Sequence, residues 1–331
     1  MFRIMVDSGA NIPAELAGRY NIEVLSFVNY INGEFETCYE PGLTPEQERQ
    51  RGKDFYDRIR GGLSVKTGLI SIGEFAEAFA RALEEGNDVL YIGISSGISG
   101  TFNSARIAAG DVMEDADAGR VVRVIDTKNA SLASGILAIY AAEMRERGMN
   151  VMETADAVEA LTGCMNGVFT VGDLKYLCKT GRISKASAMI GNTLNIKPIL
   201  RGDKDGHIVQ YKKCHGRKAA LNTLINLVCD NIVDPENQIL GIAHADAYEE
   251  SLYIMEQIQA KVKVRGFINT TYDMCTGSHV GPDTIALFFL GKDRELTGAL
   301  CGIGRSLLTK TGENLQRILS PERVAAHRSL E

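Results

Sequence analysis

The most constraining feature of this sequence is an apolar segment that runs directly into a loop of serines and glycines. Residues Asp88–Ile94 are mostly apolar, and Ser95–Thr101 then supplies four hydroxyl side chains and two glycines within seven residues. We expect a buried strand, a loop at its carboxyl end and a helix beginning near Phe102, and open α/β sheets bind ligands at that edge. Glycines allow close backbone approach, and the amides at a helix start favour an anion. The alternative is a loop that only caps the helix.

The first half of the chain alternates strand-like and helix-like segments. Residues 2–6, 89–94 and 121–125 are apolar enough for strands that helices cover on both faces. The amphipathic spacing over residues 75–83 predicts a helix, and residues 130–147 predict another. Such alternation implies right-handed crossovers and a layered α/β domain built on a parallel sheet.

Two further elements are expected within this half. Residues 22–29 are predicted to form one strand. Thr44-Pro45-Glu46 is typical of a helix N-cap followed by proline at the first helical position, so a helix is expected to extend toward Arg60.

The second half is more mixed. Residues 196–200 and 208–212 flank a Gly-Asp-Lys-Asp-Gly loop that is typical of a hairpin. Further strands are expected over 167–171, 239–243 and 285–290, and helices over 174–179, 217–232 and 248–260. Antiparallel pairs among helices predict a mixed α/β domain.

The chain is therefore expected to hold two domains. Residues 1–163 form the parallel-sheet domain, residues 164–291 form the mixed domain, and residues 292–331 are an extension without an assigned role. Two domains joined without a flexible linker commonly share a crevice, and a ligand is expected there.

Composition excludes several function classes. The formal net charge is -6 over 331 residues, which disfavours a dedicated nucleic-acid binder because phosphate neutralisation needs clustered Lys and Arg. The seven cysteines and five histidines show no metal-ligand spacing, so neither a metal nor another cofactor is expected. Neither a secretory signal nor a membrane-spanning segment is visible, which predicts a cytoplasmic protein without stable membrane insertion.

The opening loop also spells a possible nucleophile elbow. Gly93-Ile94-Ser95-Ser96-Gly97 matches G-x-S-x-G, and Asp246 and His279 follow in the chain order of α/β-hydrolases. A Ser-dependent esterase using Ser95 and His279 is therefore an alternative. Against it, an elbow runs directly from the nucleophile into its helix, whereas Gly97 and Gly100 intervene here. A third alternative is a module that binds a phosphosugar or a nucleotide.

Other polar residues fall on loops that a parallel sheet would gather at one edge. Asp7-Ser8 ends the first strand, and Thr67 precedes the amphipathic helix; each could instead be a helix cap. His279 lies in a turn-rich segment, Gly277–Pro282, where a structural role is also possible. Arg182 follows a helix stop and is free to reach a partner or stay solvated.

Together these motifs resemble the DegV family of fatty-acid-binding proteins over about residues 1 to 291. The resemblance is carried by motifs spread along the chain: Val6-Asp7-Ser8, Lys66-Thr67, Ser95–Thr101, Val124–Lys128, Leu174–Leu177, Gly181–Ser184, Leu194–Leu200, Gly216–Ala219 and Gly277–Pro282.

The resemblance implies two α/β domains with one long-chain fatty acid buried between them. Carried over by motif, the residues that bind its carboxylate are Thr67, Ser95, Ser96 and His279, on a loop supported by Asp7, Ser8, Gly97, Ser99 and Gly100. It further implies a non-catalytic carrier that presents its ligand to a separate fatty acid kinase, which makes an acyl phosphate for phospholipid synthesis. Arg182 is the residue that it nominates for docking that kinase.

Three departures from the family pattern bear on this expectation. The family's Thr-Ser-Gln-Pro is Thr67-Gly68-Leu69-Ile70 here, and its His-Thr-Gly-Pro-Gly is His279-Val280-Gly281-Pro282-Asp283. His215 stands where arginine is common. These changes affect the expected acyl-chain preference and the expected kinase partnership.

Overall fold

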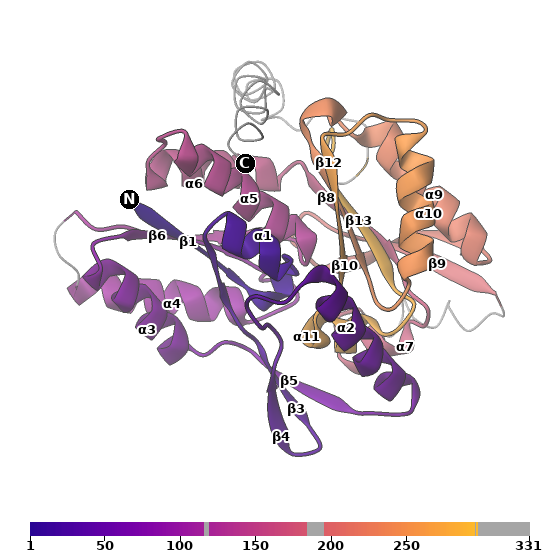
Figure 1. Cartoon of the computed structure of the whole chain (residues 1–331), viewed down its shortest axis with the longest axis horizontal. Helices are drawn as coiled ribbons and strands as arrows, with labels where there is room; N and C mark the ends of the chain where they lie inside the picture. The colour runs from indigo at the N-terminus through magenta and orange to yellow at the C-terminus, as the bar shows by residue number, and fades with distance from the viewer. Residues whose placement is uncertain (116–118, 184–194, 295, 297–331) are drawn as a thin grey trace.

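The computed structural model describes residues 1–115, 119–183, 195–294 and 296. Its first sheet consists of four parallel strands in the order β2-β1-β6-β7. These strands are β1 (Phe2–Asp7), β2 (Ile22–Leu25), β6 (Asp88–Gly93) and β7 (Val122–Asp126). The β1 and β6 side chains are mostly buried because helices cover both faces of the sheet (Figure 1), as continuous apolar strands require.

Two helices cover one face of this sheet and three cover the other. On the first face lie α3 (Ile72–Glu84) and α4 (Thr101–Asp115); on the second lie α1 (Ala14–Arg19), α5 (Leu132–Glu146) and α6 (Val151–Thr162). The start of α3 is fixed by a capping box in which the Ser71 hydroxyl accepts from the Glu74 amide and the Glu74 carboxylate accepts from the Ser71 amide. A short 3-10 helix, Ser8–Ala10, follows β1.

The second sheet has six strands in the order β10-β9-β8-β13-β11-β12. They are β8 (Met165–Thr170), β9 (Ile196–Gly202), β10 (Ile208–His215), β11 (Ile239–His244), β12 (Gly266–Thr271) and β13 (Ile285–Leu290). Among these described strands only β11 and β12 pair in parallel, so the sheet is mixed, as predicted. Helices α9 (Arg217–Asn231) and α10 (Tyr248–Gln259) pack on one face, and a 3-10 turn, Pro235–Asn237, precedes β11.

A third, antiparallel sheet in the order β4-β3-β5 projects from the first half (Figure 1). It contains β3 (Val28–Ile31), β4 (Glu34–Thr37) and β5 (Val65–Gly68), and α2 (Pro45–Arg60) lies between β4 and β5 in the chain. The single strand predicted for 22–29 is therefore wrong. The Ser26 hydroxyl accepts hydrogen bonds from the Cys38 and Tyr39 amides, and the chain changes from one sheet to the other at this point.

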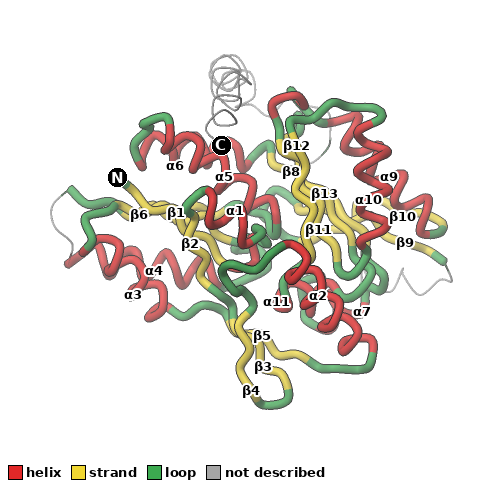
Figure 2. Tube along the Cα trace, viewed as in Figure 1, coloured by secondary structure: helices red, strands yellow, loops and turns green. Residues whose placement is uncertain are grey.

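Helix α5 lies between the two large sheets (Figure 2) and packs on strands of both. Its residues from Leu132 to Ala142 are all buried, because a helix that is apolar all round needs neighbours on every side. Gly241 of β11 permits a close approach of α5, since a Cβ there would lie 2.9 Å from Ile136. One apolar core therefore runs from the first sheet through α5 to the second.

The predicted fold class, a layered parallel-sheet domain followed by a mixed α/β domain, is confirmed. The boundary proposed after residue 163 falls between α6 and β8 and stays a prediction. The extension from residue 297 onward lies outside the described residues. The turn-rich segment predicted around His279 is instead helical as far as Val280, within α11 (Met274–Val280). The turn follows the helix at Gly281, Pro282 and Asp283, with φ 77 at Gly281 and φ 62 at Asp283. A short helix, α7 (Lys175–Lys179), faces α11.

Candidate functional site

A cavity of about 220 Å³ lies where the first sheet's loops, the small β4-β3-β5 sheet, α11 and one face of the six-stranded sheet meet. Strand alternation explains which residues of the six-stranded sheet reach it. Phe169 of β8 and Ala286 and Phe288 of β13 line the cavity, whereas Leu287 of β13 packs with α9 and α10 on the opposite face. Its apolar lining is completed by Phe27, Leu69, Ile94, Ile98, Ala130, Leu177, Ile208, Tyr272 and Val280.

Thr67 and His279 meet at one side of this cavity. Thr67 lies on β5 and His279 in the last turn of α11, and the Thr67 Oγ1 atom is 3.1 Å from His279 Nε2. The start of α11 is fixed by Asp273, whose carboxylate accepts from the amides of Cys275 and Thr276. This cap orients the helix that presents His279 to the cavity.

His279 is neutral near pH 7. Burial, together with the smaller effect of the positive charge of Arg182, lowers the pKa of its imidazole to about 4. Its Nδ1 atom has no hydrogen-bond partner among the described residues. The hydrogen-bond network therefore favours the tautomer that carries its proton on Nε2 and donates it to Thr67, which leaves the Thr67 hydroxyl proton to point elsewhere.

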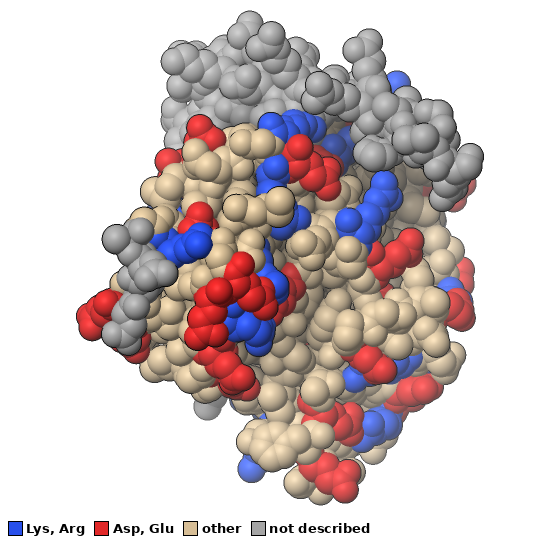
Figure 3. Space-filling view, turned by 60° about the vertical axis from the view of Figure 1, so that its left-hand side comes forward, with Lys and Arg blue, Asp and Glu red and all other residues tan. Residues whose placement is uncertain are grey.

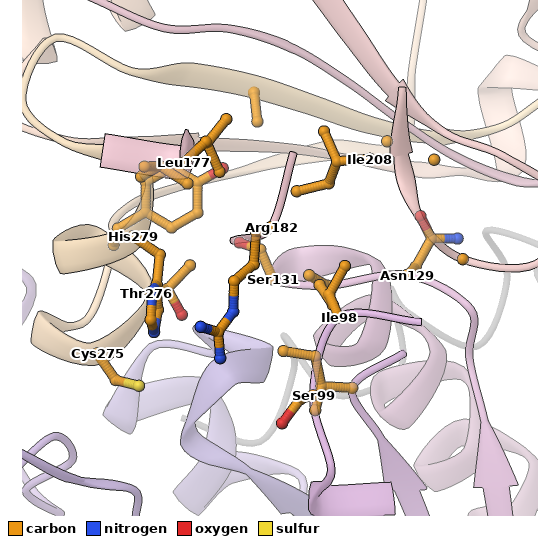
Figure 4. A pocket seen from close by; sticks show the side chains of 18 of the residues that line it. Ile98, Ser99, Asn129, Ser131, Leu177, Arg182, Ile208, Cys275, Thr276 and His279 are labelled. Carbon is orange, nitrogen blue, oxygen red and sulfur yellow. The ribbon is translucent and has the colours of Figure 1, made fainter. Parts of the chain in front are cut away.

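Arg182, predicted to dock a partner, also lines the cavity. Its Nη1 donates to the Thr180 carbonyl at 2.6 Å. Figure 4 shows its side chain reaching between Thr276 and His279 on one side and Ile98 and Ser99 on the other. A cation thus stands beside the Thr67–His279 pair.

Ser95 and Ser96 do not line the cavity. Ser95 is fully buried; its hydroxyl donates to the Gly206 carbonyl at 2.9 Å and accepts from the Gly97 amide at 3.0 Å. Ser96 is exposed and accepts from Lys128 Nζ at 2.9 Å. That either hydroxyl contacts a carboxylate stays a prediction. It requires Ser95 or Ser96 to give up the hydrogen bonds described here.

The remaining part of the predicted loop does reach the cavity. Ser99 and Gly100 line it just before α4, and the Ser99 hydroxyl bonds the Thr101 side chain and amide at 2.9 and 3.2 Å. Gly97 instead faces the turn between β9 and β10, where a Cβ would lie 2.7 Å from the Gly206 carbonyl carbon. The loop therefore needs glycine at this contact.

Asp7 and Ser8 support the site from behind. The Asp7 carboxylate accepts from the Tyr91 hydroxyl at 2.7 Å and from the Ile94 amide at 2.9 Å, and burial raises its pKa to about 6. The Ser8 hydroxyl accepts from the Phe27 amide at 3.0 Å. Both residues hold segments that carry cavity residues without lining the cavity themselves.

Sequence reasoning did not identify several polar residues of the lining. Lys128, Asn129 and Ser131 follow β7, and Cys275 and Thr276 lie on α11 with His279. The first group could have been found from its place at the carboxyl end of a parallel strand, the same signal that identified Ser95–Thr101.

The esterase alternative is not assembled here. Ser95 Oγ is hydrogen-bonded to Gly206, His279 is hydrogen-bonded to Thr67, and the third candidate, Asp246, is paired with Arg60 Nη1.

Among the residues that the structure describes, no group of three His, Cys, Asp or Glu side chains is placed to hold a metal ion. Of the described helices, none combines the length and apolar composition needed to cross a bilayer. On the face in Figure 3, Lys and Arg are interspersed with Asp and Glu.

The fold and cavity define a class of α/β proteins in which an apolar cavity is lined by loops of a parallel sheet and one face of a mixed sheet. Residues 1–292 match the family model described as "Uncharacterised protein, DegV family". The chain belongs to the DegV family.

Relatives with known sequences and structures agree over most of the chain. A DegV domain-containing protein of Clostridium perfringens is 34% identical over 298 residues, which is 89% of this chain and 99% of the relative. A DegV lipid binding protein of Thermotoga maritima has 28% identity and a TM-score of 0.74, over 89% of this chain and 100% of that one. DegV of Bacillus subtilis, described as a fatty acid binding protein, has 27% identity and a TM-score of 0.71, over 88% and 99%.

Proposed function

We propose that this protein binds one long-chain fatty acid, with the acyl chain in the apolar cavity and the carboxylate beside Thr67 and His279. The observation that carries this proposal is the combination of an apolar lining with a paired hydroxyl and imidazole at one side. The lipid and fatty acid binding of structurally similar family members supports the same ligand class.

The apolar lining supplies the affinity in this proposal. Each methylene that leaves water contributes about 0.8 kcal/mol, so a chain of roughly 14 methylenes gains about 10 kcal/mol before the costs of association. The cavity does not need charged groups along the chain, and Phe169, Ala286 and Phe288 offer none.

The carboxylate needs donors because an unpaired buried charge is costly. His279 Nε2 donates to the Thr67 oxygen, so the Thr67 hydroxyl proton is free to donate to a carboxylate oxygen. The Arg182 guanidinium adds a positive charge nearby, and Ser99 is a further hydroxyl at the cavity wall. Ser95 and Ser96, which the family resemblance nominates, join this set only if they leave their present partners.

We further propose that the bound carboxylate is presented to a separate fatty acid kinase, with Arg182 at the docking side, in the cytoplasm and toward phospholipid synthesis. A carboxylate oxygen would attack the phosphorus of a nucleotide held by the kinase, and the bond from that phosphorus to its leaving oxygen would break. This chain then acts as a carrier subunit and supplies no catalytic residue.

Native mass spectrometry of the purified protein tests the ligand proposal. We expect one bound C14–C20 acid per chain, recovered on extraction and rebound when delipidated protein receives oleate. Ligand-free protein that also fails to bind oleate would refute it. Adding a purified fatty acid kinase and ATP tests presentation separately, since failure to form acyl phosphate leaves the binding result intact.

A further inference from the structure

The start of helix α5 contributes hydrogen-bond donors to the wall of the cavity. Ser131, the N-cap residue of this helix, lines the cavity and is only 2% exposed. Figure 4 shows it around the same cavity as Thr276 and His279 of α11. Its Oγ atom has no hydrogen-bond partner among the described residues. A buried hydroxyl is ordinarily hydrogen-bonded, so the lack of a protein partner indicates a partner on the ligand.

The backbone conformation of Ser131 separates its hydroxyl from its own helix. An N-cap residue ordinarily has an extended backbone, and its side chain accepts from the amides that follow. Ser131 instead has φ 58 and ψ -145, and its side chain makes no capping hydrogen bond. Such a conformation is costly for a residue other than glycine and persists only where the surrounding structure holds it. The hydroxyl is therefore available to the cavity and is not used by α5.

The first amides of α5 also lack partners. The first backbone hydrogen bond of the helix runs from the Ser134 amide to the Ser131 carbonyl. The two amides before it, those of Leu132 and Ala133, have no acceptor among the described residues. Both residues are fully buried, and the first turn of the helix contains no acidic residue. Buried N–H groups without an acceptor are rare in folded proteins, and these two suit a ligand oxygen that accepts hydrogen bonds.

Tyr272 brings a second hydroxyl to this part of the cavity. Burial raises the pKa of its phenol, so the phenol stays protonated and can donate. The Ser131 hydroxyl lies close enough to oppose this rise in pKa, but the two oxygens do not meet in hydrogen-bond geometry. A ligand oxygen between them can bond both. Among the described residues, no Asp or Glu lines the cavity to compete for these donors.

These donors lie away from the Thr67–His279 pair. Tyr272 precedes α11, whereas His279 lies in its last turn, and a helix of seven residues rises about 10 Å. On the other side, Leu132 packs against β11 of the six-stranded sheet, where a Cβ on Gly241 would lie 3.1 Å from the Leu132 Cβ. With the carboxylate beside Thr67 and His279, the donors at the start of α5 therefore face the acyl chain several carbons further along.

We propose that the ligand of this cavity is a fatty acid with an oxygen substituent on its acyl chain, bound by Ser131, Tyr272 and the first amides of α5. The substituent is a hydroxyl or an oxo group, since both accept hydrogen bonds from these donors. An unsubstituted chain would leave the donors desolvated and unpaired, and a site built to hydrogen-bond a substrate oxygen discriminates against an analogue without it. This inference rests on the proposed fatty acid binding and narrows its substrate class.

Titration of the delipidated full-length protein with stearate and with substituted stearates tests the proposal. We expect 10-hydroxystearate, 12-hydroxystearate or the matching oxo acids to bind at least about 10-fold more tightly than stearate. 3-Hydroxystearate should gain nothing, because its hydroxyl stays beside the carboxylate. Mid-chain substituted acids that bind no more tightly than stearate would overturn the proposal, as would a gain for 3-hydroxystearate alone. If neither stearate nor any substituted acid binds, fatty acid binding itself is refuted, and this inference with it.

Two variants test which residues bind the substituent. Ser131→Ala and Tyr272→Phe should each weaken binding of the preferred substituted acid more than binding of stearate and remove most of the preference, because each deletes one hydroxyl. Tyr253→Phe is the matched control and should keep the preference, since the Tyr253 hydroxyl donates to Asn222 outside the cavity. The melting temperature and retained stearate binding show that each variant is folded. Equal losses for stearate and the substituted acid in Ser131→Ala would place Ser131 at the carboxylate and overturn the proposal.

Discussion

The Thr67 hydroxyl and the His279 imidazole lie 3.1 Å apart although 212 residues separate them in the chain. Thr67 is held in β5 by pairing with Asn29 of β3, and His279 is held by the Asp273-capped helix α11. Their contact therefore exists only when the small sheet and the C-terminal half are both folded. It joins the two halves of the protein at the place where we propose the carboxylate binds.

Replacing Thr67 by Val should weaken fatty acid binding about 10- to 100-fold, because a hydrogen bond to a charged group contributes about 1.5–3 kcal/mol. Valine keeps the shape and the strand preference of threonine. Titration of delipidated protein with oleate measures the effect. Thr37→Val on neighbouring β4, which does not line the cavity, is the matched control. Equal affinities in both variants would remove Thr67 from the site.

Ser95→Ala should lower stability by about 1–3 kcal/mol, since the Gly206 carbonyl and the Gly97 amide both lose their partner. Ser96→Ala should change stability little, because Ser96 is exposed. Denaturant unfolding of the two delipidated variants measures the free energy of unfolding of each. If Ser95→Ala leaves stability unchanged but weakens oleate binding, Ser95 contacts the carboxylate and must change partners to do so.

Asp7→Asn should be stabilising relative to the wild type above pH 6 and not below pH 4. Burial raises the Asp7 pKa from 3.8 to about 6, so the folded state binds more protons than the unfolded state between these values, and wild-type stability falls as the pH rises through them. The asparagine variant does not titrate, so it does not lose this stability. The wild-type loss in the free energy of unfolding is about 3 kcal/mol at most. Unfolding curves from pH 4 to 7 measure the difference. A constant difference across that range would contradict a raised pKa.

Arg182→Gln should raise the pKa of His279 from about 4 toward its ordinary value, because the arginine charge opposes imidazole protonation. NMR titration of the His279 ring protons in delipidated protein reads this shift directly. An unchanged His279 pKa would show that the Arg182 guanidinium is remote from the imidazole in solution. In that case Arg182 would be free for the kinase alone.

Ala286→Leu should shift the ligand preference toward shorter acids. Ala286 is buried on β13 and lines the cavity, so added side-chain volume displaces part of the acyl chain. Each displaced methylene costs about 0.8 kcal/mol, so the longest acids should lose the most affinity. Competition between C14 and C18 acids, analysed by mass spectrometry, gives the ratio. An unchanged ratio in a folded variant would place the acyl chain elsewhere.

Strong local signals made much of the fold predictable. The strand–loop–helix around Ser95, the helix capped at Thr44 and the β9–β10 hairpin each depend on neighbouring residues, and each is present. The split between β2 and β3 was missed because Ile22–Asn29 has strand character throughout. Its division depends on the Cys38 and Tyr39 amides, which lie 12 and 13 residues further along the chain and donate hydrogen bonds to the Ser26 hydroxyl.

The site was predictable in its residue types but only partly in its geometry. A hydroxyl-rich loop could be located, but which hydroxyls face the cavity depends on the turn between β9 and β10, which engages Ser95 through Gly206. The wall from β13 was not predictable, because this strand is apolar on both faces and alternation alone does not show which face borders a cavity. Tertiary packing decides which hydroxyls face the cavity and which strand face borders it.

Helix α5 has a consequence for how the chain can be divided. Because its buried surface is shared between the parallel sheet and the six-stranded sheet, a fragment ending near residue 163 would expose one side of the helix to water. We expect this fragment and the remaining C-terminal fragment each to aggregate when expressed alone, and to be soluble only when the two are expressed together. Unfolding of the intact chain should accordingly be a single cooperative transition.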